Sequence, residues 1–408
     1  MSKTFPHHAA DRKANVTPRR DMSASADPSK ASSPPAISAA SLKSRLRRVE
    51  RTPDGFFPSF DVNDATNWGP FLNTHGFVIV QILTKAECDA TVADFVADVN
   101  ARAAQGGCNP STAAAPGSSA PPRMNIDIND PMTWEDGNWP CAGRHLVGDF
   151  PALTQRAMAN RTHPNVYRFY QQLLRSDRIL CHVDCWGVMR GTAQLRWPLP
   201  PGDSGMGTAP PAMIRPPPAD AKAAAEEEEE HYYIDRPEWR SHLAPHWDVH
   251  PWWYVKERAA GRPPMFQGVL ALVDCPDDVG GFCVAAGSSA LLPEWCTKVP
   301  EQKAARAKHF DLPSNDDWYD SLQHVPLRAG EMVVWDSGSL HANFANFGPS
   351  MRIVQYLRCL TRESAEGDAV RAVYLPENTQ AKWGVEYARL PYALPPLSRR
   401  MLGLDPWP

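Results

Sequence analysis

The chain has 408 residues, of which 43% are hydrophobic, and a formal net charge of −4. This length allows one large domain or two average ones, and the hydrophobic content is enough for a core. The charge gives no overall basic field that would draw the protein onto nucleic acid. No apolar run reaches the ~20 residues needed to cross a membrane.

The N-terminal residues 1–52 are rich in Ser, Ala, Pro, Lys and Arg. They cannot bury enough apolar surface to fold alone, so we expect a disordered tail. The tail has no apolar signal-peptide core, and the nine cysteines of the chain form no CxxC pairs, which indicates free thiols in a reducing compartment. We therefore expect an intracellular, cytoplasmic protein; the basic stretch Leu42–Val49 leaves organelle targeting as an alternative.

Residues 53–408 are predicted to form a single domain with two low-complexity insertions, near 106–122 and 198–230. In chain order, the first expected elements are a β-branched strand ending at Val80 and a helix that Thr84 can cap. A second helix is expected over 164–174, because it begins at a proline, and an alternating strand over 179–186.

Beyond Tyr232 the pattern changes to short strands between turn signals. Such strands are expected at 266–273, 282–285, 330–336 and 351–359. Short strands with Gly and Pro punctuation favour a β-sandwich or jelly roll. The predicted fold class is therefore mainly β with flanking helices.

A candidate metal site lies in the sequence Ala-Pro-His-Trp-Asp-Val-His-Pro-Trp-Trp. If this stretch is extended, His246 and Asp248 point to the same face. His341 is the best third ligand, because it follows a strand and a turn. Two histidines and one carboxylate on one face leave three positions open, as in non-haem iron(II) oxygenases. His250 is an alternative ligand, since His-x-Asp-x-His would also suit a zinc hydrolase.

If the site holds an iron(II) oxygenase centre, 2-oxoglutarate is a candidate co-substrate. It carries a distal carboxylate that is best bound by an arginine. Arg352 stands at the head of the last predicted strand, and Ser350 could donate a second hydrogen bond. Gln267 and Asn343 are further candidates for binding the co-substrate or orienting a ligand.

Four groups of residues, taken in order, carry a resemblance to a known family. They are His246–His250, Gly280–Ser289, Gly330–Asp336, and His341 with Asn346 and Arg352. Their order and spacing closely resemble the phytanoyl-CoA dioxygenase-like family. The turn departs from the family pattern, with Ala286 where proline is usual and Ala290 where histidine is usual.

The resemblance implies a double-stranded β-helix, the jelly-roll core of cupin-like proteins. It implies that His246, Asp248 and His341 bind Fe(II) and act in catalysis, and that Arg352 binds 2-oxoglutarate. Dioxygen would be the second co-substrate, and ascorbate is a candidate reductant. Because Asp248 keeps the ligand carboxylate, halogenation is not expected.

We thus expect a dioxygenase that hydroxylates a C–H bond of a small organic substrate, either an acyl compound or a secondary metabolite. Two alternatives remain: a non-catalytic or zinc-binding jelly-roll protein, and an oxygenase acting on a nucleobase or a protein side chain. The sequence gives neither the particular substrate nor the oligomeric state.

Overall fold

The computed structural model describes residues 42–105, 123–141, 146–147, 150–198, 214–215, 231–301, 309–366 and 371–408. Apart from Pro198 and residues 214–215, both predicted insertions lie outside the described residues, as does the chain before residue 42. The tail boundary expected at residue 52 is too late. Leu42 and Val49 are buried, and Arg45 pairs with Glu294 at 2.5 Å. These contacts with distant residues hold a segment whose composition alone predicts disorder.

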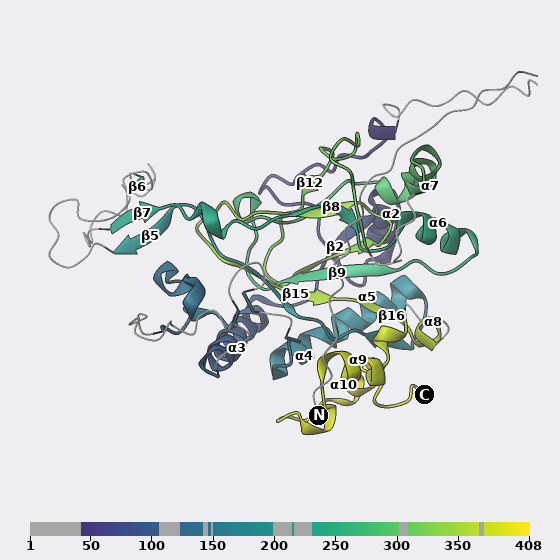
Figure 1. Ribbon diagram of the computed structural model, residues 1–408. Helices are drawn as coiled ribbons and strands as arrows, with labels where there is room; N and C mark the ends of the chain where they lie inside the picture. The colour runs from purple at the N-terminus through teal and green to yellow at the C-terminus, as the bar shows by residue number, and fades with distance from the viewer. Residues whose placement is uncertain are drawn as a thin grey trace, which may run out of the picture. The chain divides into compact units, whose positions relative to one another are not determined.

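Two sheets form the centre of the protein (Figure 1). The six-stranded sheet has, in spatial order, β1 (Phe60–Asp61), β2 (Phe77–Gln81), β13 (Glu331–Asp336), β9 (Phe266–Ala271), β15 (Arg352–Leu357) and β4 (Trp186–Met189). The five-stranded sheet has β11 (Phe310–Asp311), β8 (Leu243–Trp247), β14 (His341–Phe344), β10 (Gly281–Val284) and β12 (Gln323–His324). All neighbouring strands are antiparallel except β1 and β2.

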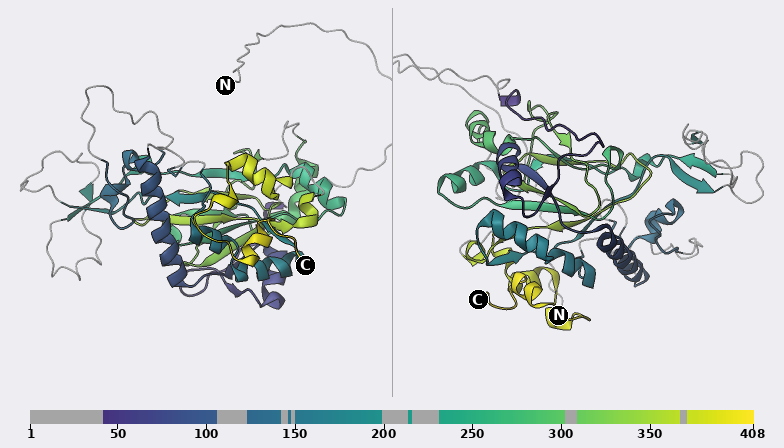
Figure 2. Two further views of the ribbon diagram at one scale, coloured as in Figure 1. Left: turned by 90° about the horizontal axis from the view of Figure 1, so that it is seen from below. Right: turned by 180° about the vertical axis from the view of Figure 1, so that it is seen from behind.

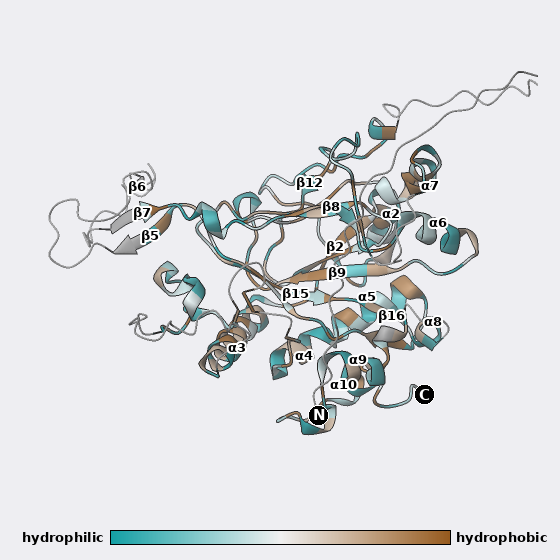
Figure 3. Cartoon of the chain, viewed as in Figure 1, coloured by the Kyte–Doolittle hydropathy of each residue, from teal (hydrophilic) through white to brown (hydrophobic). Residues whose placement is uncertain are grey.

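The inner face of the six-stranded sheet packs against the five-stranded sheet. Ile79, Val333 and Val354 from the first sheet share one apolar cluster with Phe282 and Val284 from β10. Because strand side chains alternate, the neighbouring residues of β2, β13 and β15 point to the outer face, where a second cluster buries them. Burial on both faces explains why these strands are largely apolar, and β9 appears hydrophobic over most of its length in Figure 3.

Helices cover the outer face of the six-stranded sheet (Figures 1 and 2). Buried residues of the outer cluster come from α2 (Ala65–His75), α3 (Lys85–Ala104), α4 (Gln155–Arg161), α5 (Pro164–Leu174) and α10 (Pro396–Met401). The Thr84 side chain accepts a hydrogen bond from the Glu87 amide, and the Glu87 side chain accepts one from the Thr84 amide. This capping box fixes the start of α3, as the sequence predicted.

Two other helices, α6 (Pro251–Ala259) and α7 (Ser288–Lys298), pack beside the five-stranded sheet. Trp247 and Val249 pack with Trp252 of α6 and Trp295 of α7 in a third apolar cluster. The side chains on either side of Asp248 therefore face into packing, as expected. Ser288 begins a helix, although the sequence suggested only a turn there.

Two predicted strands are each divided in the structure, and the other elements below were not predicted. The expected strand 179–186 is divided into β3 (Ile179–Cys181) and β4, and 351–359 into β15 and β16 (Cys359–Thr361). A small sheet contains β5 (Leu195–Pro198), β7 (His231–Ile234) and β6 (Ile214–Arg215), and the C-terminal helices are α8 (Arg362–Glu366), α9 (Pro376–Trp383) and α10 (Pro396–Met401). Short 3-10 helices are η2 (Pro131–Trp134), η3 (Asp136–Asn138), η5 (Pro237–Trp239), η6 (Asp277–Val279), η7 (Ala372–Tyr374) and η8 (Tyr387–Arg389).

The expected mainly β fold with flanking helices agrees with these two packed sheets. Within the described ranges, no helix is both long enough and apolar enough to span a membrane. The expectation of thiols throughout is wrong for Cys141, which takes part in a disulfide bond. Seven described cysteines form no disulfide bond: Cys88, Cys181, Cys185, Cys275, Cys283, Cys296 and Cys359.

Candidate metal centre

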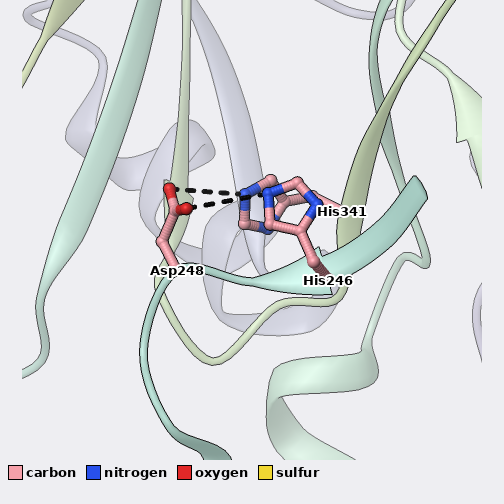
Figure 4. A group of neighbouring side chains, drawn as sticks. All are labelled: His246, Asp248 and His341. Atoms are coloured by element: carbon pink, nitrogen blue, oxygen red, sulfur yellow. Dashed lines mark ion pairs between the residues drawn. The ribbon is translucent and has the colours of Figure 1, made fainter. Parts of the chain in front are cut away.

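Strand pairing brings the three predicted metal ligands together. β14 runs antiparallel to β8, with His341 directly opposite His246, and Asp248 follows the end of β8. The carboxylate lies 3.6 Å from Nε2 of His246 and 3.7 Å from Nε2 of His341. In Figure 4 the carboxylate faces both imidazoles. One ligand atom from each of the three residues lies within 4.8 Å of the others.

Backbone carbonyls orient both imidazoles. Nδ1 of His246 lies 2.7 Å from the Ala244 carbonyl, and Nδ1 of His341 lies 3.0 Å from the Ser339 carbonyl. A carbonyl can only accept, so Nδ1 carries the proton in each ring and the Nε2 lone pair points toward Asp248. Burial and the neighbouring His341 lower the pKa of His246 to about 4, so this ring is neutral near pH 7.

Asp248 is ionised although it is largely buried. Burial raises the pKa of this carboxyl, but the neighbouring His309, His341 and Arg358 side chains lower it well below its usual range. The guanidinium of Arg358 lies 3.4 Å from Oδ2. Nδ1 of His309 lies 3.8 Å from Oδ1.

These residues fit a divalent transition metal. Two imidazole nitrogens and one carboxylate oxygen converge on one space, which is the donor set of the facial triad of non-haem iron enzymes. His250 does not belong to this group: it lies at the start of α6, where its ring packs against Trp252 and Phe310. The arrangement therefore favours the triad over a His-x-Asp-x-His zinc site.

Arg352 lies on the inner face of the six-stranded sheet, because Val354, two residues along β15, belongs to the inner cluster. Its side chain is 3% exposed, yet among the described residues no carboxylate lies within 4.0 Å of its guanidinium. Gly281 makes room for it: a Cβ at this glycine would lie 2.4 Å from Nε of Arg352. A buried cation without an acidic partner is costly, so the position favours an anionic ligand.

The other predicted co-substrate residues differ in their surroundings. Gln267 is buried on the same inner face as Val269, and its Oε1 has no hydrogen-bond partner among the described residues. Asn343 is half-buried in β14, two residues beyond His341. Ser350 lies exposed in the turn before β15, where its carbonyl accepts a hydrogen bond from Asn346. The proposed pairing of Ser350 with Arg352 at a buried carboxylate is therefore not supported.

Sequence reasoning missed two residues that lie beside the carboxylate. His309 precedes β11, which pairs with β8 so that Asp311 is opposite His246; this places His309 beside Asp248. No local pattern indicates this pairing. Arg358 follows β15 in phase with Arg352 and Val354, and an extended reading of that strand could have found it.

Comparisons with known proteins agree with the motifs. The phytanoyl-CoA dioxygenase (PhyH) family model matches residues 234–354, which include all three triad residues and Arg352. A Dictyostelium discoideum protein that is provisionally named a phytanoyl-CoA dioxygenase is 19% identical over 404 residues, covering 86% of this chain and 96% of that protein. Residues 234–354 thus match the phytanoyl-CoA dioxygenase family, which supports the resemblance that the motifs predicted.

Solved structures also resemble this chain, at low similarity. The non-haem monooxygenase ThoJ in complex with nickel is 15% identical, with a TM-score of 0.38 over 72% of this chain and 77% of that chain. A Salmonella typhimurium LT2 protein provisionally called an oxidoreductase is 13% identical, with a TM-score of 0.49 over 85% and 86% of the two chains. Because both TM-scores are below 0.5, these likenesses carry no weight for the site or the substrate.

Proposed function

We propose that this protein is an Fe(II)- and 2-oxoglutarate-dependent dioxygenase that hydroxylates a C–H bond of a small organic substrate, on a double-stranded β-helix core. The observation that carries the proposal is the pairing of two features on the inner side of the sandwich. One is the convergence of His246, Asp248 and His341. The other is the buried Arg352, which has no carboxylate partner among the described residues.

His246, Asp248 and His341 would hold the metal, and their convergence leaves the opposite side of the ion free. Bound Fe(II) would supply the oxidising chemistry by activating dioxygen while 2-oxoglutarate is decarboxylated. Arg352 would bind the distal carboxylate of the co-substrate through its planar fork. Gln267 would donate or accept a hydrogen bond at the same inner face, where its Oε1 is otherwise unpartnered.

The surrounding side chains keep water from the reacting groups. Phe282 and Trp335 pack within 6.0 Å and 5.2 Å of the His341 ring, measured between ring centroids. Both are buried in the inner cluster. An apolar wall beside the metal strengthens the electrostatic interactions in the site and limits the loss of the oxidant to solvent.

A small-molecule substrate, an acyl compound or a secondary metabolite, agrees best with the net charge of −4, which gives no basic field for nucleic acid. A screen of candidate compounds would identify the substrate, and the molar mass in solution would give the oligomeric state. No observation among the described residues favours an oxygenase of nucleobases or protein side chains over this proposal.

The test is anaerobic reconstitution with Fe(II) and 2-oxoglutarate, followed by visible spectroscopy for the metal-to-ligand charge-transfer band. The wild type should develop the band, and Asp248→Ala should lose it, because one of three ligands is gone. Asp405→Ala, which removes a surface carboxylate that pairs with Arg399, is the matched control and should retain it.

A band that survives in Asp248→Ala would place the iron elsewhere and refute the assignment. Tight zinc binding in the wild type, with no band and no 2-oxoglutarate turnover, would favour the zinc-binding or non-catalytic alternative.

A further inference from the structure

Arg358 lies beside the candidate metal centre, and neither the family motif nor the proposed chemistry uses it. It directly follows β15, and its guanidinium Nη2 lies 3.4 Å from Oδ2 of Asp248. Its side chain is 36% exposed, compared with 27% for that of Asp248. A permanent cation therefore contacts the carboxylate oxygen of Asp248 that also lies 3.7 Å from Nε2 of His341.

A second carboxylate, that of Asp184, also influences Arg358. The charge of Asp184 acts on the Arg358 guanidinium, and Oδ2 of Asp184 lies 3.5 Å from Nδ1 of the buried His182. Burial raises the pKa of Asp184, but the neighbouring His182 and the charge of Arg358 lower it well below its usual range. Arg358 thus interacts electrostatically with two ionised carboxylates, Asp248 and Asp184.

The backbone around this cluster is rigidly held. The His182 amide donates a 2.9 Å hydrogen bond to the Arg358 carbonyl. The fully buried Arg161 donates to the carbonyls of His182 and Asp184, at 2.8 and 3.1 Å. These hydrogen bonds hold the backbone at His182, Asp184 and Arg358 in place.

We propose that Arg358 is a positioning residue for Asp248: its N–H donates to Oδ2, so that the carboxylate offers one oxygen to the metal. This inference rests on the proposed function. Asp248 follows the end of β8, so its side chain needs an external partner to hold its rotation. A carboxylate that bound the metal through both oxygens would occupy one of the open positions required by co-substrate and dioxygen.

The experiment measures the dissociation constant for Fe(II), by anaerobic titration of the metal-free protein without co-substrate, and then the charge-transfer band with 2-oxoglutarate. Loss of a partner that orients a ligand typically weakens metal binding by about 10- to 100-fold. We expect Arg358→Gln to raise the dissociation constant by that factor. Arg358→Lys should give a smaller, several-fold rise, because an ammonium keeps the charge but not the fork.

Arg178→Gln is the matched control, because Arg178 pairs with Glu363 at 3.2 Å on the surface, where both side chains are about half exposed (55% and 54%). It should leave metal binding unchanged. Folding of each variant is checked by circular dichroism. If Arg358→Gln does not fold, Arg358→Lys decides: a raised dissociation constant supports the proposal and an unchanged one overturns it.

A folded Arg358→Gln protein that binds Fe(II) as tightly as the wild type, within two-fold, would overturn the positioning role. A change confined to 2-oxoglutarate affinity at saturating metal would do the same, because it would make Arg358 an anion-binding residue. If the wild type binds Fe(II) but gives no band with 2-oxoglutarate, the proposed function fails, while the metal titrations still decide the role of Arg358. A wild type that binds no metal would overturn both.

Discussion

Gly281 lies against the guanidinium of Arg352, and a methyl group at this position has no room. A Cβ there would lie 2.4 Å from Nε, 3.0 Å from Cζ and 3.1 Å from Cδ of Arg352, and the glycine has φ +112°. In Gly281→Ala the guanidinium must move away from its present position. The backbone conformation adds a strain of about 1–3 kcal/mol.

The displaced guanidinium should weaken co-substrate binding. A hydrogen bond to a charged group contributes about 1.5–3 kcal/mol, which corresponds to a rise of about 10- to 150-fold in the dissociation constant of 2-oxoglutarate. The assay titrates 2-oxoglutarate into the Fe(II)-loaded protein under anaerobic conditions and follows the charge-transfer band. Fe(II) affinity should stay the same, because Arg352 is not one of the three converging ligands.

Gly261 provides the control, because it has φ +78° and a Cβ added to it would meet no atom within 4 Å. Gly261→Ala should lower the free energy of unfolding by about 1–2 kcal/mol and leave 2-oxoglutarate binding unchanged. The reasoning is wrong if Gly281→Ala binds 2-oxoglutarate like the wild type, or if Gly261→Ala weakens binding equally.

Three further predictions concern stability, each measured by urea unfolding of the metal-free protein. Folding lowers the pKa of His246 to about 4 from about 6.5 in the unfolded chain. The neutral ring is therefore favoured by folding, and the free energy of unfolding should fall by up to about 3 kcal/mol as the pH drops from 6.5 to 4. If the free energy of unfolding of His246→Asn depends on pH in this range as that of the wild type does, the prediction is wrong. Phe95→Ala should lower the free energy of unfolding by about 3–5 kcal/mol, because Phe95 is fully buried against Trp186 at 5.3 Å between ring centroids. As a control, alanine at the 42% exposed Phe344 should change this free energy by no more than about 0.5 kcal/mol. Equal losses in the two variants would refute the assignment of Phe95 to the core. Thr84→Ala should lower the free energy of unfolding by about 1 kcal/mol, because it breaks the capping box at the start of α3. An unchanged free energy of unfolding would mean that tertiary packing alone holds this helix.

The local elements were predictable where a few neighbouring residues decide them. The helix Pro164–Leu174 has the bounds that the sequence suggested, and α3 begins after the threonine expected to cap it. The strands β9 and β13 are continuous apolar runs, because both of their faces are buried. Capping, proline position and hydrophobic alternation act over a few residues, so they can be read without a structure.

The sequence also determined which three residues converge at the candidate metal centre. His246 and Asp248 lie two residues apart at the end of one strand, and His341 begins another. Their spacing within an ordered set of motifs is a property of the chain itself, and the family match confirms the resemblance.

Only the tertiary structure decided what surrounds the candidate metal ligands. His309 reaches Asp248 because β11 pairs with β8 across 62 intervening positions, and Arg358 lies 3.4 Å from Asp248, which is 110 positions away in sequence. Packing against residues far along the chain likewise orders Leu42–Val49, and turn geometry leaves Ser350 exposed. Such contacts depend on strand register and on the closing of long loops, which local propensity does not encode.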